Sequence, residues 1–217
     1  MRLKIACLLA TALAGAGTAT LAQQPAADGG NFVEGRHYQR LSPAQPTVTD
    51  DATVEVAEIF MYSCPACYSL EPHLKRWLAA KPENVTFVRI PASFNPMAKI
   101  HAQAYYTAQA LGKAEEIDAP FFEEFHQKRN ALDTEAKLAD FFERFGVDEE
   151  TFKKTFNSFA VHTNVQRADE LVRRYRVPGT PAIVVEGKYL TNGSMAGSYD
   201  AWFAVVTDLA ARELQAE

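Results

Sequence analysis

Hydrophobic and polar positions divide the chain into stretches with the period of a strand and stretches with the period of a helix. Residues 54–62 are rich in β-branched and aromatic side chains and predict a buried strand, and residues 85–90 predict a second one. Between them, residues 68–80 carry apolar side chains at helical spacing. Phe32 to Leu41 is expected to contribute a short strand where the fold begins.

Residues 95–175 show helical periodicity only. Most of the phenylalanines in this block recur three or four positions apart, which favours a core between helices over a ligand pocket. Asp133 and Asp148 are placed to cap the starts of two helices, and Gly146 to end one. This block therefore predicts several short helices in succession.

Strand patterns return near the C-terminal end. Residues 182–190 predict a hairpin that turns at Glu186-Gly187. Residues 192–197 are expected to form a flexible loop, and Ser198 to cap a last helix. The whole order predicts an α/β fold in which a helical domain is inserted into a small sheet domain.

The first 22 residues have a different composition. Arg2 and Lys4 precede a run of apolar and small residues without an acidic side chain, which predicts a secretory signal peptide cleaved after Ala22. An uncleaved membrane anchor is the alternative, but the run is short and rich in Ala, Thr and Gly. Residues 23–31 are polar and small and are expected to be flexible.

Charge and cysteine content narrow the class of function. The formal net charge is −5, and loss of the signal would make it more negative, which argues against nucleic-acid binding. Cleavage would also remove Cys7 and leave Cys64 and Cys67. An exported chain whose cysteines form a single C-x-x-C pair is not a disulfide scaffold.

Cys64-Pro65-Ala66-Cys67 lies where the predicted strand over residues 54–62 gives way to a helix. The N–H groups of a helix's first turn have no intrahelical partner and stabilise a thiolate, so the pKa of Cys64 is expected to be low. Pro65 suits the first helical position. A slightly strained disulfide beside a stabilised thiolate favours the reduced form, so the oxidised form would pass its disulfide on.

Two other interpretations of this motif are a structural disulfide and half of a zinc site. A disulfide that closes so short a loop removes little conformational entropy from the unfolded chain and would therefore stabilise the fold only slightly. Zinc needs two further ligands at close spacing, and the histidines lie singly along the sequence. We therefore interpret the pair as redox-active and expect neither a metal nor a cofactor.

Further motifs accompany the cysteine pair in a characteristic order and spacing. Together with it they are Glu58, Phe60, Cys64-Pro65, Cys67-Tyr68, Glu71, Asn157-Ser158-Phe159, Val177-Pro178-Gly179-Thr180-Pro181-Ala182 and Gly187-Lys188-Tyr189. With these residues the chain resembles the DsbA family of periplasmic thiol:disulfide oxidoreductases, in the thioredoxin superfamily. The resemblance covers about residues 32–214.

The resemblance implies a thioredoxin fold with an inserted helical domain. Residues 32–94 and 176–217 would form the thioredoxin-like domain, and residues 95–175 the insertion. It also implies that Cys64 is the exposed nucleophile and Cys67 the buried resolving thiol.

The resemblance further implies roles for the supporting residues. Pro181 would be cis and lie against the disulfide, and Thr180 would offer backbone groups to an extended peptide. Glu58 and Glu71 match acidic positions, and Arg89 a basic one, so they could relay the proton that Cys67 loses and regains. The alternatives are an exposed strand end for Glu58 and solvated surface for Glu71 and Arg89.

The implied function is a monomeric periplasmic oxidase that donates its disulfide to reduced or unfolded exported proteins. A DsbB-type inner-membrane quinone reductase would reoxidise it. One departure is Ala66, where the family's prototype has a histidine, so a higher Cys64 pKa and a weaker oxidant are expected. Alternatives are a specialised reductase, an isomerase, a copper(I) chaperone with Cys64 and Cys67 as ligands, and a peptide-binding module.

Overall fold

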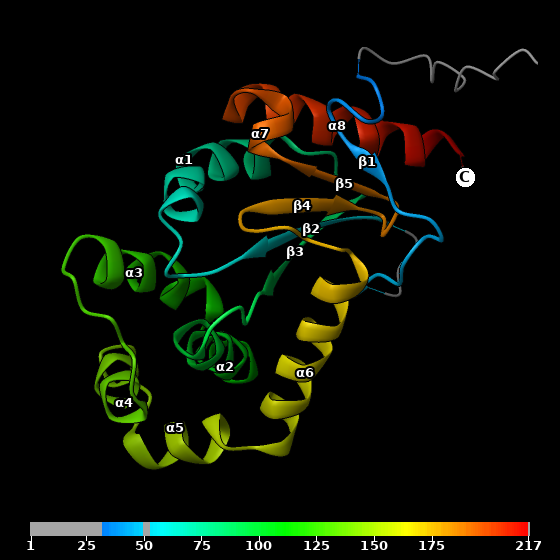
Figure 1. The fold of residues 1–217 in the computed structure, drawn as a ribbon. Coiled ribbons are helices and arrows are strands. Elements are labelled where there is room, and N and C mark those ends of the chain that lie inside the picture. The colour runs from blue at the N-terminus through cyan, green and yellow to red at the C-terminus, as the bar shows by residue number, and fades with distance from the viewer. Residues whose placement is uncertain (1–31, 50–52, 217) are drawn as a thin grey trace, which may run out of the picture.

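The computed structural model describes residues 32–49 and 53–216, so the predicted signal peptide and residues 23–31 lie outside the described residues. Figure 1 shows a sheet covered by helices, with further helices set to one side of it. The strands are β1 (Gln39–Arg40), β2 (Val54–Phe60), β3 (Val85–Pro91), β4 (Ala182–Val185) and β5 (Tyr189–Asn192). The helices are α1 (Pro65–Ala80), α2 (Pro96–Ala110), α3 (Ala114–His126), α4 (Glu135–Glu143), α5 (Glu149–Phe156), α6 (Phe159–Arg174), α7 (Gly193–Ala196) and α8 (Tyr199–Ala216).

The strands form one sheet in the order β1-β5-β4-β2-β3. β2 runs parallel to β3 and antiparallel to β4. Val54 and Val56 pack with α1 and α8 on one face, while Ala57 and Ile59 pack with α6 on the other. Because side chains alternate along a strand, Glu58 falls on the face that α1 covers.

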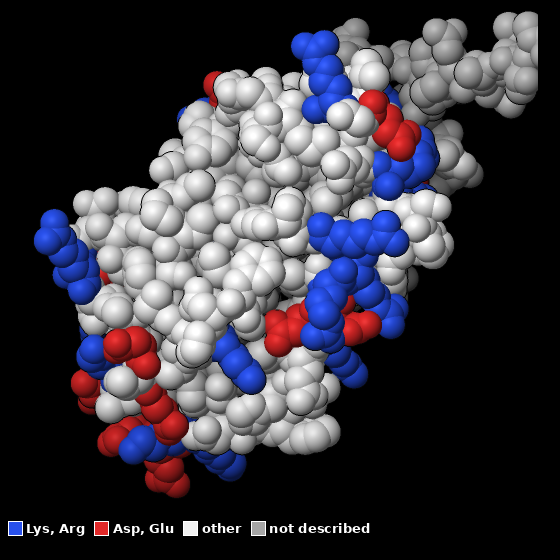
Figure 2. Space-filling view, in the orientation of Figure 1, with Lys and Arg blue, Asp and Glu red and all other residues white. Residues whose placement is uncertain are grey.

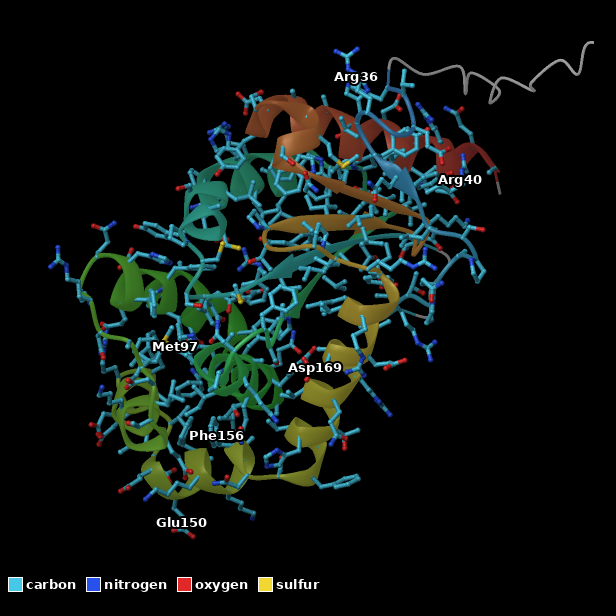
Figure 3. All side chains as sticks on the ribbon, in the orientation of Figure 1. Arg36, Arg40, Met97, Glu150, Phe156 and Asp169 are labelled. Carbon is cyan, nitrogen blue, oxygen red and sulfur yellow. The ribbon has the colours of Figure 1, made fainter. Side chains whose placement is uncertain are left out.

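The five helices between β3 and β4 pack around aromatic side chains. Phe121, Phe142 and Phe152 are fully buried there, which confirms the helix–helix core that the spacing predicts. Figure 3 shows Phe156 among these helices and Glu150 at their outer edge. The α/β fold with an inserted helical block is therefore present. Within the two described ranges, none of the helices has the length and apolar character that a membrane crossing requires.

Three local expectations can be compared with the structure. Asp148 caps α5, and its Oδ1 accepts a hydrogen bond from the Thr151 N–H at 2.8 Å, as predicted. The prediction for Asp133 is wrong, because Thr134 caps α4 and Asp133 pairs with Lys137 instead. The flexible loop expected over residues 192–197 is also wrong, since Asn192 accepts a hydrogen bond from the Met195 N–H and starts the short helix α7.

Gly187 should tolerate no side chain. Its φ is +57°, and a Cβ there would lie 2.0 Å from the carbonyl oxygen of Gln45, whereas Gly146 has a φ of +79° and open space around it. We expect Gly146→Ala to cost about 1–2 kcal/mol of unfolding free energy through backbone strain alone. Gly187→Ala should cost clearly more in urea unfolding. Equal losses would contradict the close packing of Gln45 against the hairpin.

Candidate active site

Cys64 is the residue at which the chain turns from β2 into α1. It caps the N-terminus of α1, and the backbone N–H of Cys67 points at its Sγ from 3.4 Å. Pro65 takes the first helical position, where a backbone N–H would have had no partner. The Cys64 N–H donates to the Met61 carbonyl oxygen at 3.1 Å and fixes the turn. The Cys64 sulfur therefore lies at the positive end of the helix dipole.

The two cysteines are free thiols and differ in accessibility. Cys67 is fully buried and Cys64 is 8% exposed. Cys64 is thus the thiol that a reactant can reach, although neighbouring residues cover most of its surface.

The two cysteines are also the side chains that could bind a soft metal ion. Among the described residues, no group of three or more His, Cys, Asp or Glu side chains is placed to hold a metal.

The surroundings of the two thiols give them opposite acidities. A hydrogen bond from the Cys67 thiol, with weaker ones from Thr180 and from the Cys67 and Ala66 N–H groups, outweighs burial and lowers the pKa of Cys64 from 9.0 to about 5. Burial, and then the neighbouring Cys64 sulfur, raise the pKa of Cys67 far above its ordinary value. Near neutral pH Cys64 is therefore a thiolate and Cys67 a thiol.

The turn before β4 lies beside the start of α1 at the same end of the sheet (Figure 1). The Thr180–Pro181 peptide bond is cis, as the resemblance implies. The Thr180 carbonyl oxygen lies 3.3 Å from the Cys64 Sγ. The structure therefore brings Thr180 and Pro181 to the cysteine turn from a distant part of the sequence.

A groove with a volume of about 670 Å³ opens beside this turn. The Tyr199 hydroxyl, at the start of α8, donates to the Ala66 carbonyl oxygen at 3.3 Å across it. The residues that line the groove are Ala66, His73, Pro178, Gly179, Thr180, Pro181, Asn192, Gly193, Ser194, Gly197, Ser198, Tyr199, Asp200 and Trp202.

An ion-paired cluster lies beneath the cysteine turn. The register of β2 and β3 sets Glu58 opposite Arg89, and the Arg89 Nε donates to Glu58 Oε2 at 2.9 Å. Glu71, from α1, accepts a hydrogen bond from Nη2 of the same arginine. The side chains of Glu58, Arg89 and Glu71 are 0%, 10% and 24% exposed. An exposed strand end for Glu58 and solvated surface for Glu71 and Arg89 are therefore the wrong interpretations.

Asp118 and Tyr62 belong to the same cluster, and the sequence analysis missed both. Asp118 comes from α3 of the inserted block, and its Oδ2 accepts from Arg89 Nη1 at 3.2 Å. Its Oδ1 accepts from the buried Tyr62 hydroxyl. A signal was available, because Asp118 lies three and four positions before Phe121 and Phe122 and so falls on the inward face of α3.

Curated relatives of the chain share one description. A thiol:disulfide interchange protein DsbA of Pseudomonas aeruginosa is 37% identical over 172 residues, which are 79% of this chain and 81% of that protein. The protein of the same description from Azotobacter vinelandii is 32% identical over 212 residues, or 98% and 97% of the two chains. This chain belongs to the DsbA family.

Family and structure comparisons agree with the DsbA assignment. The family model described as DSBA-like thioredoxin domain matches residues 97–201. The crystal structure of Pseudomonas aeruginosa DsbA has a TM-score of 0.80 at 34% identity, covering 85% of this chain and 96% of that one. Oxidoreductase DsbA from Xylella fastidiosa has a TM-score of 0.80 at 30% identity, covering 85% and 98%. The chain is therefore a thiol:disulfide oxidoreductase with a thioredoxin fold and a helical insertion.

Alkylation of the reduced protein should distinguish the two thiols. We expect iodoacetamide to modify Cys64 alone near neutral pH, because the thiolate is the reacting form and Cys67 is a buried thiol. The rate at Cys64 should fall as the pH is lowered through about 5. A time course by peptide mass spectrometry measures both, with Cys64→Ser as the control. Equal rates at the two cysteines would refute the assignment of Cys64 as the nucleophile.

Proposed function

We propose that this DsbA family member is a periplasmic dithiol oxidase that donates its Cys64–Cys67 disulfide to exported proteins whose cysteines are still reduced. The location is supported by residues 1–22, which have the composition of a cleavable signal peptide. The direction of the reaction is supported by the pKa of about 5 at Cys64. A thiolate that the enzyme stabilises makes its reduced form favourable and its disulfide a ready donor.

The reaction proceeds through a mixed disulfide. A substrate thiolate attacks Cys64, forms an S–S bond to it and breaks the Cys64–Cys67 bond, and the departing Cys67 sulfur takes up a proton. A second substrate thiolate then attacks the substrate sulfur of the mixed disulfide and releases Cys64 as a thiolate. The substrate loses two electrons and the enzyme disulfide gains them. Cys64 is the sulfur attacked because Cys67 is fully buried.

The surface around the cysteine turn suits an unfolded polypeptide. Figure 2 shows charged side chains gathered toward the margins of this face, while its centre is mostly uncharged. An uncharged surface can accept the apolar side chains that an unfolded chain exposes. Within the groove, the backbone of Thr180 is the part that would pair with an extended peptide beside Cys64.

The proposal extends to the reoxidation partner, the oligomeric state and the domain limits. After each turnover a DsbB-type inner-membrane quinone reductase would restore the disulfide, and the enzyme would act as a monomer. The thioredoxin-like domain would comprise residues 32–94 and 176–217, and the insertion residues 95–175. These limits are supported by the end of β3 at Pro91, the start of α2 at Pro96 and the end of α6 at Arg174.

Disulfide transfer to a reduced peptide with two cysteines tests the proposed function. We expect the oxidised enzyme to form one peptide disulfide per molecule and Cys64→Ser to form none. Cys67→Ser that carries a mixed disulfide with glutathione at Cys64 should pass through a mixed disulfide with the peptide before the second peptide thiol releases the enzyme. Mass spectrometry without reductant measures all three. Stoichiometric copper in the purified protein without transfer would instead indicate a metal chaperone. A reduction potential near the roughly −270 mV of thioredoxin would indicate a reductase.

The redox forms should differ in stability in a pH-dependent way. The pKa of Cys64 is lower in the folded protein than in the unfolded chain, so its thiolate stabilises the reduced native state. This contribution is complete above the unfolded pKa of about 8.5 and is lost as the pH falls through about 5. We therefore expect urea melts to show the reduced form as the more stable one near neutral pH, with a smaller difference below pH 5.

Ala66→His extends the same measurement. An imidazole beside the thiolate should widen the stability difference, lower the Cys64 pKa and make the enzyme a stronger oxidant together, because one linkage governs all three. Ala79→His, on the exposed end of the same helix, is the matched control and should change none of them. If the oxidised wild-type protein were clearly more stable than the reduced protein, the Cys64–Cys67 pair would have to be interpreted as a structural disulfide.

A further inference from the structure

One guanidinium donates hydrogen bonds to carboxyl groups from three separate elements of the fold. Arg89, on β3, donates from Nε to Glu58 of β2, from Nη2 to Glu71 of α1 and from Nη1 to Asp118 of α3. Its side chain is 10% exposed and lies over the rings of Phe60 and Phe122. The three carboxyl groups therefore compete for a single buried cation.

The charges of this cluster do not balance. With all three carboxyl groups ionised, two negative charges would remain uncompensated among groups that are largely removed from water. Burial opposes such a state. It raises the pKa values of Glu58 and Asp118, and raises that of Glu71 to about 7, against the opposing effect of Arg89. The cluster therefore retains a proton near neutral pH.

Hydrogen bonding favours Glu58 over Asp118 as the holder of this proton. Asp118 accepts from two donors, the Arg89 guanidinium and the Tyr62 hydroxyl, which stabilise its ionised form. Glu58 accepts from Arg89 alone, and its Oε1 is buried without a hydrogen-bond partner among the described residues. A carboxyl oxygen in that position gains most from carrying the proton.

We propose that Asp118, held by Tyr62, is a positioning residue of the disulfide exchange, because its carboxylate shares the single charge of Arg89 with Glu58 and so keeps a proton on Glu58 near Cys67. When the disulfide opens, the Cys67 sulfur leaves as a thiolate in a fully buried position, and Glu58 gives it this proton. On reoxidation Cys67 returns the proton to the Glu58 carboxylate. The inference rests on the proposed function and adds the inserted helical block to the chemistry.

Most of the elements around Glu58 contribute a titratable or charged group, whereas β4 sets the apolar Ile183 opposite it. The titratable and charged groups are Tyr62 after β2, Cys64, Cys67 and Glu71 from the α1 segment, Arg89 from β3, Tyr105 from α2, and Asp118 from α3. The Tyr105 hydroxyl donates to the Arg89 carbonyl oxygen at 3.3 Å, and burial raises its pKa. In the oxidised enzyme neither cysteine titrates, so the carboxyl groups are the titrating acids of the cluster, and the pKa of Glu71 is raised to about 7.

Carbon NMR of the oxidised full chain, with glutamate labelled at the side-chain carboxyl carbon, tests the inference directly. Glu58→Gln identifies the Glu58 signal by its loss. We expect Asp118→Asn to lower the Glu58 titration midpoint by about one pH unit, a tenfold loss of proton affinity. Tyr62→Phe should lower it by less, because the Asp118 charge stays but loses its hydroxyl donor. Asp133→Asn, at an exposed site in the loop before α4, should leave the midpoint unchanged.

The pH dependence of disulfide opening by dithiothreitol supplies the kinetic test. The opening rate of Asp118→Asn, divided by that of the wild type, should pass through a minimum at pH values between the Glu58 midpoints of the two proteins. In that range only the wild type still carries the proton on Glu58. The minimum should vanish when both proteins also carry Glu58→Gln. A loss of stability without a shifted midpoint would mean that Asp118 only supports the fold, and unshifted midpoints in both Asp118→Asn and Tyr62→Phe would overturn the inference.

These readouts need no protein substrate, so the inference and the proposed function can fail separately. A shifted Glu58 midpoint in a chain that transfers no disulfide to the reduced peptide would refute the oxidase and its proton step. Full transfer activity with an unshifted midpoint would refute the role of Asp118 alone.

Discussion

The sharing of Arg89 among Glu58, Glu71 and Asp118 is the interaction that ties the architecture to the cysteine site. It joins the two parallel strands, the helix that carries the cysteines and the inserted block at one point. Desolvation offsets much of what such a buried cluster gains, but removal of the arginine would leave carboxyl groups uncompensated, at a cost of about 3–5 kcal/mol. The cluster therefore makes correct docking of α3 a condition for a correct charge state beneath the cysteines.

Burial and hydrogen bonding also set the acidities of the two cysteines, and their balance differs between the two sulfur atoms. Cys64 receives hydrogen bonds from Cys67 and from the first turn of α1, and these outweigh its burial. Cys67 lies one turn further along, where burial dominates and the adjacent sulfur adds to it. Two thiols of one short motif thus differ in ionisation, with Cys64 as a thiolate and Cys67 as a thiol near neutral pH. In the proposed reaction, the acid cluster beneath them supplies and takes back the proton of Cys67.

Much of the fold could be predicted from local sequence. The period of residues 54–62, the helical block after β3 and the returning hairpin indicated an α/β fold with a helical insertion, and the phenylalanine spacing indicated its helical core. The position of Cys64 at a helix start followed from the strand before it and from Pro65. Local preference failed at Asp133, because that side chain pairs with Lys137 and the adjacent Thr134 caps the helix instead. It failed at residues 192–197, because the Asn192 side chain accepts a backbone hydrogen bond that starts a short helix there.

The sequence by itself determined the cysteine motif, the orientation of Cys64 on its helix and the order of strands and helices, because each depends on residues within a few positions of one another. Only the tertiary structure decided that the Thr180 carbonyl oxygen lies 3.3 Å from Cys64 and that Tyr62 and Asp118 meet across 56 positions of sequence. Contacts of that kind arise when separate elements pack, and a side chain's burial and partners set its pKa. Which groups of the site carry protons is therefore decided by the packed structure, although all of these residues can be read from the sequence.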